Sequence, residues 1–548
     1  MTRAHFRERT SVVSPEPIVG RYNFTSFFEF SDRVNKISED EELREQRRNR
    51  DTHFILRLAG RDIVQFPDFK ILAEVATMRH VRVHTDIPVP LVYAYGLADD
   101  NPANLCPFII MEYMKHEKSL VQDLGDPERE FGRRRLALDA NVSDEPLAVV
   151  WDQLASYLLQ LYAKMEIPCI GSLHPQYDST SRRAPTLSLF TGVPHADDWY
   201  VALADMHMAQ LVFQQNDLTS TSNAFRTMYV ARQLFRQLAR AGKLSSFGFG
   251  DDTWSAQARK VGREEQSRRY AASPGSSGPF RLWCDDLSAD NFLLDKDRVV
   301  TGFALDPPAW LLFCEPGAGP EELDEWSKTY ASRLPAWLRS MEKAEAKAEA
   351  EAEAEATPTM EKDKTGLEVE RDLDQAAEKL SLEDPAPKTI EENPPSPSPS
   401  TPTLTNSTDA NTPLPAKMSR YMRESWETGR FWLNSAARSS VLFDYIYWAY
   451  LDERFFGPRK VSTGHEVPEL WRLRQYNNTD AKMERRMQRD IEDHDFWRAR
   501  IGLLGDDHRE AMHTLAARKM DELREGDKLV DWADDAAREH LKEFLKPS

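Results

Sequence analysis

An aspartate and an asparagine with four residues between them, Asp286 and Asn291, stand directly before the apolar run FLL. In this spacing a carboxylate can accept the proton of an attacking hydroxyl, while the amide oxygen holds a Mg²⁺ ion on nucleotide phosphates. The spacing is also common in ordinary turns that precede a strand. The pair alone therefore leaves a phosphoryl-transfer loop and a simple turn as alternatives.

The pattern of apolar residues predicts the elements that must position these two side chains. Residues 18–32 alternate apolar and polar residues, with several aromatics, which is typical of a strand in a hairpin. Elsewhere the sequence predicts strands at 54–58 and 107–114 and helices at 69–84, 146–166 and 196–240. His207 lies in the last of these helices between two methionines, where we expect it to serve in packing.

Six blocks of sequence occur in an order that points to one family. The run LWCDDLSADNFL at 282–293 is similar to a loop of the form LWCDDxxPxNxL, with Ala289 in place of the proline. The other five blocks are FILRLAGRDIVQFPDFKILAEVATMRHV at 54–81, IPVPLVYAY at 87–95, PFIIMEYM at 107–114, IGSL at 170–173 and MRESWETGRFWLNSAARSSVLFDYIYWAYLDERFFG at 422–457. Together they resemble the fungal branch of the aminoglycoside phosphotransferase/choline kinase-like family.

The resemblance implies an α+β fold of the two-lobe protein-kinase-like type. A small antiparallel-sheet N-lobe would precede a mostly helical C-lobe that carries a long disordered insertion. It implies ATP and Mg²⁺ as cofactors and phosphoryl transfer to the hydroxyl of a small-molecule acceptor, which the sequence does not identify. Asp286 would then be the catalytic base and Asn291 a metal ligand.

The same resemblance assigns nucleotide-binding roles in the first part of the chain. Arg57 takes the position of a strand cation that contacts the phosphates, and Glu74 that of the helix acid that orients it. A guanidinium suits this role because it is always charged and binds phosphate through two hydrogen bonds. Glu112 and Tyr113 fall at the hinge, where backbone groups would meet adenine. The alternatives are that Arg57 is an ordinary surface residue, that Glu74 is a solvated helix residue, and that the hinge segment is a plain core strand.

The nucleotide-covering loop of the family would fall at Gly20, Asn23 and Ser26. These residues do not form a G-x-G-x-x-G pattern, so an ordinary strand turn is an equal alternative. The polar residues 33–53 that follow are expected to be a solvated insertion, which a surface loop tolerates at about 0.6 kcal/mol per doubling of its length.

The chain departs from the family pattern at the second metal ligand. An Asp in a D-F-G-like turn, usually IDWE in this family, should follow the catalytic loop, but the chain reads DKDRVVTGFALDPPAWLLF. Asp306 is the candidate substitute, although the prolines after it favour extended backbone and a structural Asp in a turn is the alternative. If Asp306 is not the metal ligand, about a dozen residues of the family's metal-binding turn are missing between Gly302 and Asp306. The chain is then a pseudoenzyme that acts by binding partners, or its sequence carries a misplaced splice boundary.

Composition and patterning divide the chain into five segments. The net charge is −19, and the acidic stretch 341–415 contributes −11 of it, from 18 acidic and 7 basic residues. The expected segments are a polar tail at 1–17, an N-lobe at 18–114 with its insertion at 33–53, the first part of a C-lobe at 115–340, an acidic low-complexity, disordered linker at 341–415, and helical completion of the C-lobe with charged, mostly surface helices at 416–548.

Several classes of protein are not expected. No run approaches 18 apolar residues, so a transmembrane helix is not predicted, and the first residues lack the apolar core of a secretory signal. The four cysteines are widely spaced without a Cys/His cluster, which predicts neither zinc nor disulfides and fits a cytoplasmic protein. A basic stripe for nucleic acid is missing. The linker at 341–415 is a candidate binding segment for a protein partner.

Overall fold

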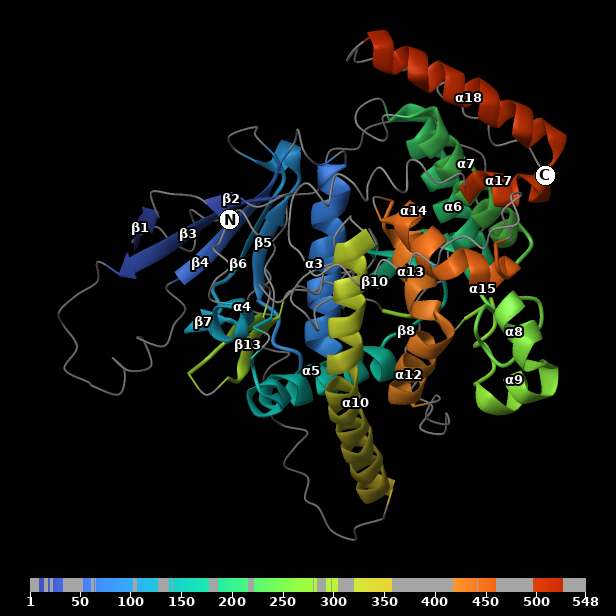
Figure 1. Ribbon diagram of the computed structural model, residues 1–548. Coiled ribbons are helices and arrows are strands. Elements are labelled where there is room, and N and C mark those ends of the chain that lie inside the picture. Colours follow the sequence, from blue (N-terminus) through green and yellow to red (C-terminus); the bar gives the residue numbers. More distant parts are fainter. Residues whose placement is uncertain are drawn as a thin grey trace, which may run out of the picture.

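The computed structural model has a mixed α+β architecture, mainly helical with small antiparallel sheets (Figure 1). This confirms the α+β class predicted from the sequence. The structure describes residues 9–13, 18–19, 23–32, 53–60, 64, 66–101, 106–126, 138–139, 141–176, 186–214, 221–278, 280–282, 292–296, 298–303, 320–356, 417–440, 442–459 and 496–525.

The largest sheet has six antiparallel strands and lies at one side of the molecule (Figure 1). Its order is β1-β3-β4-β6-β5, with β2 paired to β3. The strands are β1 (Arg9–Val13), β2 (Ile18–Val19), β3 (Asn23–Asp32), β4 (His53–Ala59), β5 (Val92–Gly96) and β6 (Phe108–Glu112). The strands predicted at 18–32, 54–58 and 107–114 are therefore present. Residues 9–13 were expected in a polar tail but instead pair with β3 as an edge strand.

Helix α3 (Pro67–His84) packs on this sheet. Proline fits the first turn of a helix, because the backbone N–H that it lacks would have no partner there. Residues spaced three and four apart, Ile71, Val75 and Met78, face the sheet and form a small core with Ile109 and Met111. The apolar residues whose spacing predicted this helix therefore form the face that it buries.

A second, larger core lies among the helices. Its principal helices are α5 (Asp144–Lys164), α6 (Ala196–Phe213), α7 (Ser222–Arg240), α10 (Pro320–Ala356), α12 (Met418–Thr428) and α13 (Arg430–Arg438). Shorter ones are α4 (Leu120–Leu124), α8 (Ala256–Val261), α9 (Arg263–Arg269), α14 (Phe443–Ile446), a π-helical turn (Tyr447–Leu451) and α15 (Asp452–Phe456). Trp151 of α5 meets Trp337 of α10 edge to face at 6.1 Å, so two of the largest side chains join helices far apart in sequence.

Three small sheets connect the sheet side to the helices. A three-stranded sheet is formed by β13 (Val300–Phe303), β12 (Phe292–Leu294) and β7 (Lys118–Ser119). Strand β8 (Glu166–Ile167) pairs with β11 (Phe280–Arg281), and β9 (Ile170–Gln176) pairs with β10 (Thr186–Val193). Ala76 of α3 packs against Ile167 and Leu173 of this region, so α3 also contacts the helical side.

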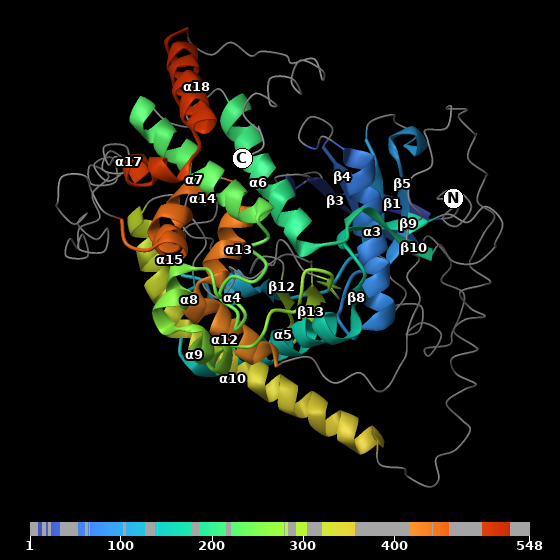
Figure 2. The same cartoon turned by 90° about the vertical axis from the view of Figure 1, so that its right-hand side faces the viewer.

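The run KAEAKAEAEAEAEA at 343–356 continues α10 into the expected linker as far as Ala356, and the far end of this helix extends away from the other helices (Figure 2). Alternating Ala and Glu propagate a helix well. Glu345 is buried and accepts hydrogen bonds from the backbone N and the hydroxyl of Ser419, 2.8 and 2.6 Å away, at the start of α12. The rest of the expected linker, and the insertion expected at 33–53 up to residue 52, lie outside the described residues.

The C-terminal helices lie mostly at the surface, as expected, but a few of their residues are buried in the large core. Phe496 and Trp497 of α17 (Phe496–Arg500), and Met512 and Leu515 of α18 (Asp506–Glu525), belong to the large core. The high charge of this segment predicted a surface location, but its few apolar residues are clustered on the side that meets α7.

In the part of the chain that the structure describes, no helix is both long enough and apolar enough to cross a bilayer.

His207 is a packing residue, as predicted. Its ring is fully buried beside Phe443, and Nε2 lies 3.0 Å from the carbonyl oxygen of Ala437. Burial, and next the charge of Arg232, lower the pKa of His207 to about 4. In the unfolded chain the pKa of His207 should be about 6.5. Between a pH of about 6.5 and about 4, the unfolded chain therefore binds a proton at His207 and the folded protein does not.

We therefore expect His207 to destabilise the fold as the pH falls from about 6.5 towards about 4, by up to about 1.4 kcal/mol per pH unit. Above this range its contribution is constant. Urea denaturation of the wild type and of His207→Gln across this range would measure the two slopes, and the wild type should be steeper. His80, whose pKa is also lowered to about 4 by burial and by His84, affects both proteins alike. Equal slopes would contradict the assignment.

Candidate functional site

Arg57 and Glu74, which the sequence analysis paired, are in contact. Arg57 lies on β4, a central strand, opposite Thr25 of β3 and Ile109 of β6. Its Nη1 donates to Oε1 of Glu74 on α3, which forms an ion pair. The strand and the helix are packed through their apolar faces, and this packing brings two residues 17 positions apart together.

The ion pair is partly buried. The side chains of Arg57 and Glu74 are 28% and 19% exposed, so the guanidinium still has a face open to solvent. Burial alone would raise the pKa of Glu74, but the charges and hydrogen bonds of Arg57 and Lys70 outweigh it and lower the pKa below its usual value. Glu74 is therefore held as a carboxylate that pairs with both cations.

Lys70 was missed by the sequence analysis. It lies one helical turn before Glu74, and its Nζ is 2.9 Å from Oε2 of Glu74 and 2.8 Å from Oδ1 of Asn23. The spacing of four residues between Lys70 and Glu74 was a visible signal for the first contact. Nothing local could indicate the second, because Asn23 belongs to another element.

Glu112 and Tyr113 lie where the chain leaves the sheet. Oε2 of Glu112 accepts a hydrogen bond from the backbone N–H of Leu91 at 3.0 Å and lies 3.8 Å from Nη1 of Arg82. The ring of Tyr113 packs against Phe27 and His53, with centroids 5.8 and 6.0 Å away. Both side chains thus make contacts within the sheet region, and a part in binding adenine would fall to the backbone, as the sequence analysis expected.

Asp286, Asn291 and Asp306 lie outside the described residues, but the elements on either side of them are described. Before Asp286, the β8–β11 pair ends at Arg281, and the N–H of Leu282 donates to the carbonyl oxygen of Met165 at 3.3 Å. After Asn291, β12 begins at Phe292. Its residues Phe292 and Leu293 pair with Phe303 and Gly302 of β13.

The hairpin of β12 and β13 is fixed to the helical side by side chains at its turn. Asp123 of α4 is nearly fully buried and forms ion pairs with Lys118 and with Arg298 of the turn. Burial alone would raise the pKa of Asp123, but these hydrogen bonds outweigh it and lower the pKa. Gln153 donates to the carbonyl oxygen of Arg298 and accepts from the N–H of Val300, each at 3.0 Å. Arg298 has φ +60°, a left-handed backbone that these contacts hold in place.

The described residues contain no group of three or more His, Cys, Asp or Glu side chains that could hold a metal ion. The residues predicted to bind Mg²⁺, Asn291 and Asp306, are not among them. Their oxygen donors are of the kind that Mg²⁺ prefers. They adjoin the two strands of a hairpin whose register brings Phe292 opposite Phe303.

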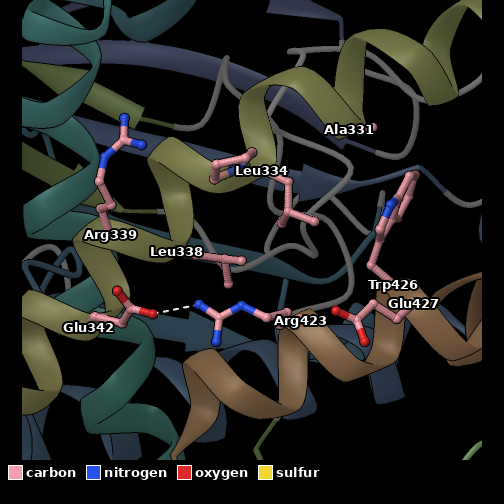
Figure 3. Close-up of a pocket in the computed structure, with 9 residues that line it drawn as sticks. Ala331, Leu334, Leu338, Arg339, Glu342, Arg423, Trp426 and Glu427 are labelled. Atoms are coloured by element: carbon pink, nitrogen blue, oxygen red, sulfur yellow. Dashed lines mark hydrogen bonds and ion pairs between the residues drawn. The ribbon is translucent and has the colours of Figure 1, made fainter.

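Among the described residues, a groove lies between α10 and α12 (Figure 3). It has a volume of about 380 Å³ and is lined by apolar side chains such as Leu334, Leu338 and Trp426. An ion pair between Arg423 and Glu342 crosses it, with 2.5 Å between Nη2 and Oε1. Of the predicted site residues that the structure describes, Arg57, Glu74, Glu112 and Tyr113, none lines this groove.

The chain matches no protein-family model, no curated protein and no solved structure.

Proposed function

We propose that this chain is an ATP-dependent phosphotransferase with a two-lobe protein-kinase-like fold, which transfers a phosphoryl group to the hydroxyl of a small molecule. The observation that carries the proposal is the ion pair between Arg57 on β4 and Glu74 on α3. In kinases a strand cation and a helix carboxylate form such a pair, and the cation contacts the nucleotide phosphates.

The arrangement of the sheet supports the proposal. Strand β4 leads directly into α3 along the chain, and β6 lies between β4 and β5. The chain then passes from Glu112 to β7, and the N–H of Glu117 donates to the carbonyl oxygen of Leu294 at 2.9 Å. The segment at 113–117 therefore connects a small antiparallel sheet to the larger helical core, as a hinge between two lobes would.

The elements on either side of the motif support the roles of the residues that they adjoin. Asn291 is bonded to Phe292, and Asp306 follows Phe303, the partner of Phe292, by three residues. Three residues of chain span at most about 11 Å. Asn291 and Asp306 are therefore tethered to the same end of one hairpin, which suits a shared role as ligands of Mg²⁺.

In the proposed reaction, Asp286 accepts the proton of the acceptor hydroxyl as its oxygen attacks the terminal phosphorus of ATP, and ADP leaves. Arg57, oriented by Glu74, neutralises charge on the phosphates that remain with ADP. A bound Mg²⁺ ion would neutralise charge on the transferring group. Asn291 and Asp306 would hold it. Backbone groups at Glu112 and Tyr113 would bind adenine.

A catalytically impaired protein that acts as a binding partner is the second candidate. The sequence GFALDPPAW favours it, because the metal-binding Asp is followed by two prolines in place of the family's turn. The two candidates differ in turnover and in the nucleotide binding that turnover requires. Only the enzyme requires Mg²⁺-dependent binding of ATP.

We expect ATP with Mg²⁺ to stabilise the wild-type protein by about 2.7 kcal/mol at a ligand concentration of 100 times Kd. ATP without Mg²⁺ should stabilise it less, and Arg57→Ala should remove most of the effect of both. Thermal unfolding with and without each ligand is the measurement. Arg524→Ala, which alters an exposed arginine on α18, is the matched control and should respond as the wild type does.

Two outcomes would decide against the enzyme. If ATP with Mg²⁺ leaves the wild-type unfolding temperature unchanged, the chain does not bind the nucleotide and the second candidate stands. If Arg57→Ala responds as fully as the wild type, the ion pair has no part in binding, and the observation that carries the proposal fails.

A further inference from the structure

Lys70 joins two parts of the candidate nucleotide site that are 47 residues apart in the chain. Its Nζ lies 2.8 Å from Oδ1 of Asn23 and 2.9 Å from Oε2 of Glu74. The other carboxylate oxygen of Glu74 binds Arg57. The four side chains therefore form one continuous series of polar contacts from β3, through α3, to β4.

The strand register identifies the part of the sheet that Lys70 contacts. Asn23 is the first residue of β3 and pairs with Ala59, while Thr25 pairs with Arg57. The short strand β2 pairs with the same part of β3, with Val19 opposite Phe24. Lys70 thus binds the beginning of β3, within two residues of the position opposite Arg57.

The beginning of β3 pairs with β4 on one side and only with the short strand β2 on the other. Strand β2 contains two residues, and a short two-stranded pairing adds little stability by itself. Lys70 is 27% exposed and Glu74 19% exposed, so water only partly weakens their charge-assisted hydrogen bonds. Two cations, Arg57 and Lys70, share the single carboxylate of Glu74.

We infer that Lys70 is a positioning residue for nucleotide binding. It holds the beginning of β3 against α3, so that this strand and Arg57 present one fixed arrangement to the phosphates of a nucleoside triphosphate. The identity of the ligand rests on the proposed function. The link that Lys70 makes between β3 and α3 rests on the observed contacts. Lys70 acts through Asn23 and Glu74 and does not itself bind the nucleotide.

The link is tested first without a ligand, by hydrogen exchange. Lys70→Met keeps the length of the side chain and removes its charge and its donors. Amides at the beginning of β3 should then exchange about tenfold faster than in the wild type. Lys347→Met, which removes the lysine of another pair at the same four-residue spacing, on α10, is the matched control and should leave them unchanged. Unchanged protection in Lys70→Met would overturn the inference.

The effect on binding is tested with ATP and Mg²⁺, and with adenosine as a ligand that lacks phosphates. Lys70→Met and Asn23→Ala should each weaken the affinity for ATP about tenfold, which equals about 1.4 kcal/mol. The double variant should be little weaker than either one, because both remove the same link. The affinity for adenosine should not change, and Lys70→Arg should keep most of the affinity for ATP.

The remaining outcomes separate the inference from the proposed function. If Lys70→Met loses affinity for ATP while Asn23→Ala keeps it, Lys70 contacts the phosphates directly and the positioning role is wrong. If both variants bind ATP as the wild type does, the inference is wrong while the proposed function stands. If the wild type binds no ATP although Lys70→Met exchanges faster, the proposed function and the nucleotide role are both wrong, and only the structural link is supported.

Discussion

Asp286→Asn should lower the rate of phosphoryl transfer by about 10²- to 10⁴-fold, the contribution typical of a general base. An amide has nearly the shape of a carboxylate but cannot accept the proton of the attacking hydroxyl. ATP should still bind, since Asp286 is assigned to the acceptor and not to the nucleotide. The loss should therefore appear in kcat, with the KM for ATP nearly unchanged.

The measurement is ADP release with Mg²⁺ in the presence of a panel of small hydroxyl compounds, compared between the wild type and the variant. Asp285→Asn, which alters the adjacent carboxylate of the same loop, is the matched control and should cause a much smaller loss. If Asp286→Asn keeps most of the wild-type rate, Asp286 is not the base. If the wild type binds ATP but transfers no phosphoryl group to any compound, the binding protein becomes the better description.

Asp452→Ala should destabilise the fold by about 3–5 kcal/mol, the range typical when one partner of a buried ion pair is removed. Asp452 is fully buried. Arg500 donates to both of its carboxylate oxygens, with Nε 3.0 Å from Oδ1 and Nη2 2.9 Å from Oδ2. Arg459 also donates to Oδ2, at 3.3 Å. Removal of this carboxylate would leave two nearly buried guanidinium groups without their buried charge partner, although Arg500 also donates to the carbonyl oxygen of Gly457 and Arg459 to that of Trp448.

Chemical denaturation of the wild type and the variant measures this loss. Asp521→Ala removes the acid of an exposed pair with Arg524, and its effect should be below about 1 kcal/mol. The contrast between the two variants tests burial, because both remove one carboxylate from an Arg pair. A loss below about 1 kcal/mol for Asp452→Ala would mean that water or a conformational change satisfies the two arginines.

The part of the candidate site that the sequence predicted well is local in the chain. The strand at 54–58 and the helix at 69–84 follow from the spacing of their apolar residues, and both are present as β4 and α3. The contact between Arg57 and Glu74 followed from the resemblance, and the packing of these two elements produces it. Its role towards a nucleotide stays a prediction, as do the roles of Asp286, Asn291 and Asp306.

The misjudged parts depend on partners that are distant in the chain. Residues 9–13 are polar enough to suggest a tail, and only the neighbouring β3 makes them a strand. The C-terminal segment was expected to lie mostly at the surface because of its charge, and most described side chains of α18 are at least partly exposed. Phe496 and Trp497, however, are buried against other helices, and Arg500 is buried with Asp452 from a segment 48 residues earlier.

The sequence by itself predicted the principal strands and helices, which follow from periods of two and 3.6 that the chain displays locally. The α+β class followed from the resemblance and is confirmed, whereas the residues assigned to phosphoryl transfer, also taken from the resemblance, stay predictions. The tertiary structure alone decided that Lys70 meets Asn23, that Arg298 meets Asp123 and that Asp452 is buried with two arginines. Such contacts depend on strand register and helix packing, which bring together side chains whose separation in the sequence carries no signal.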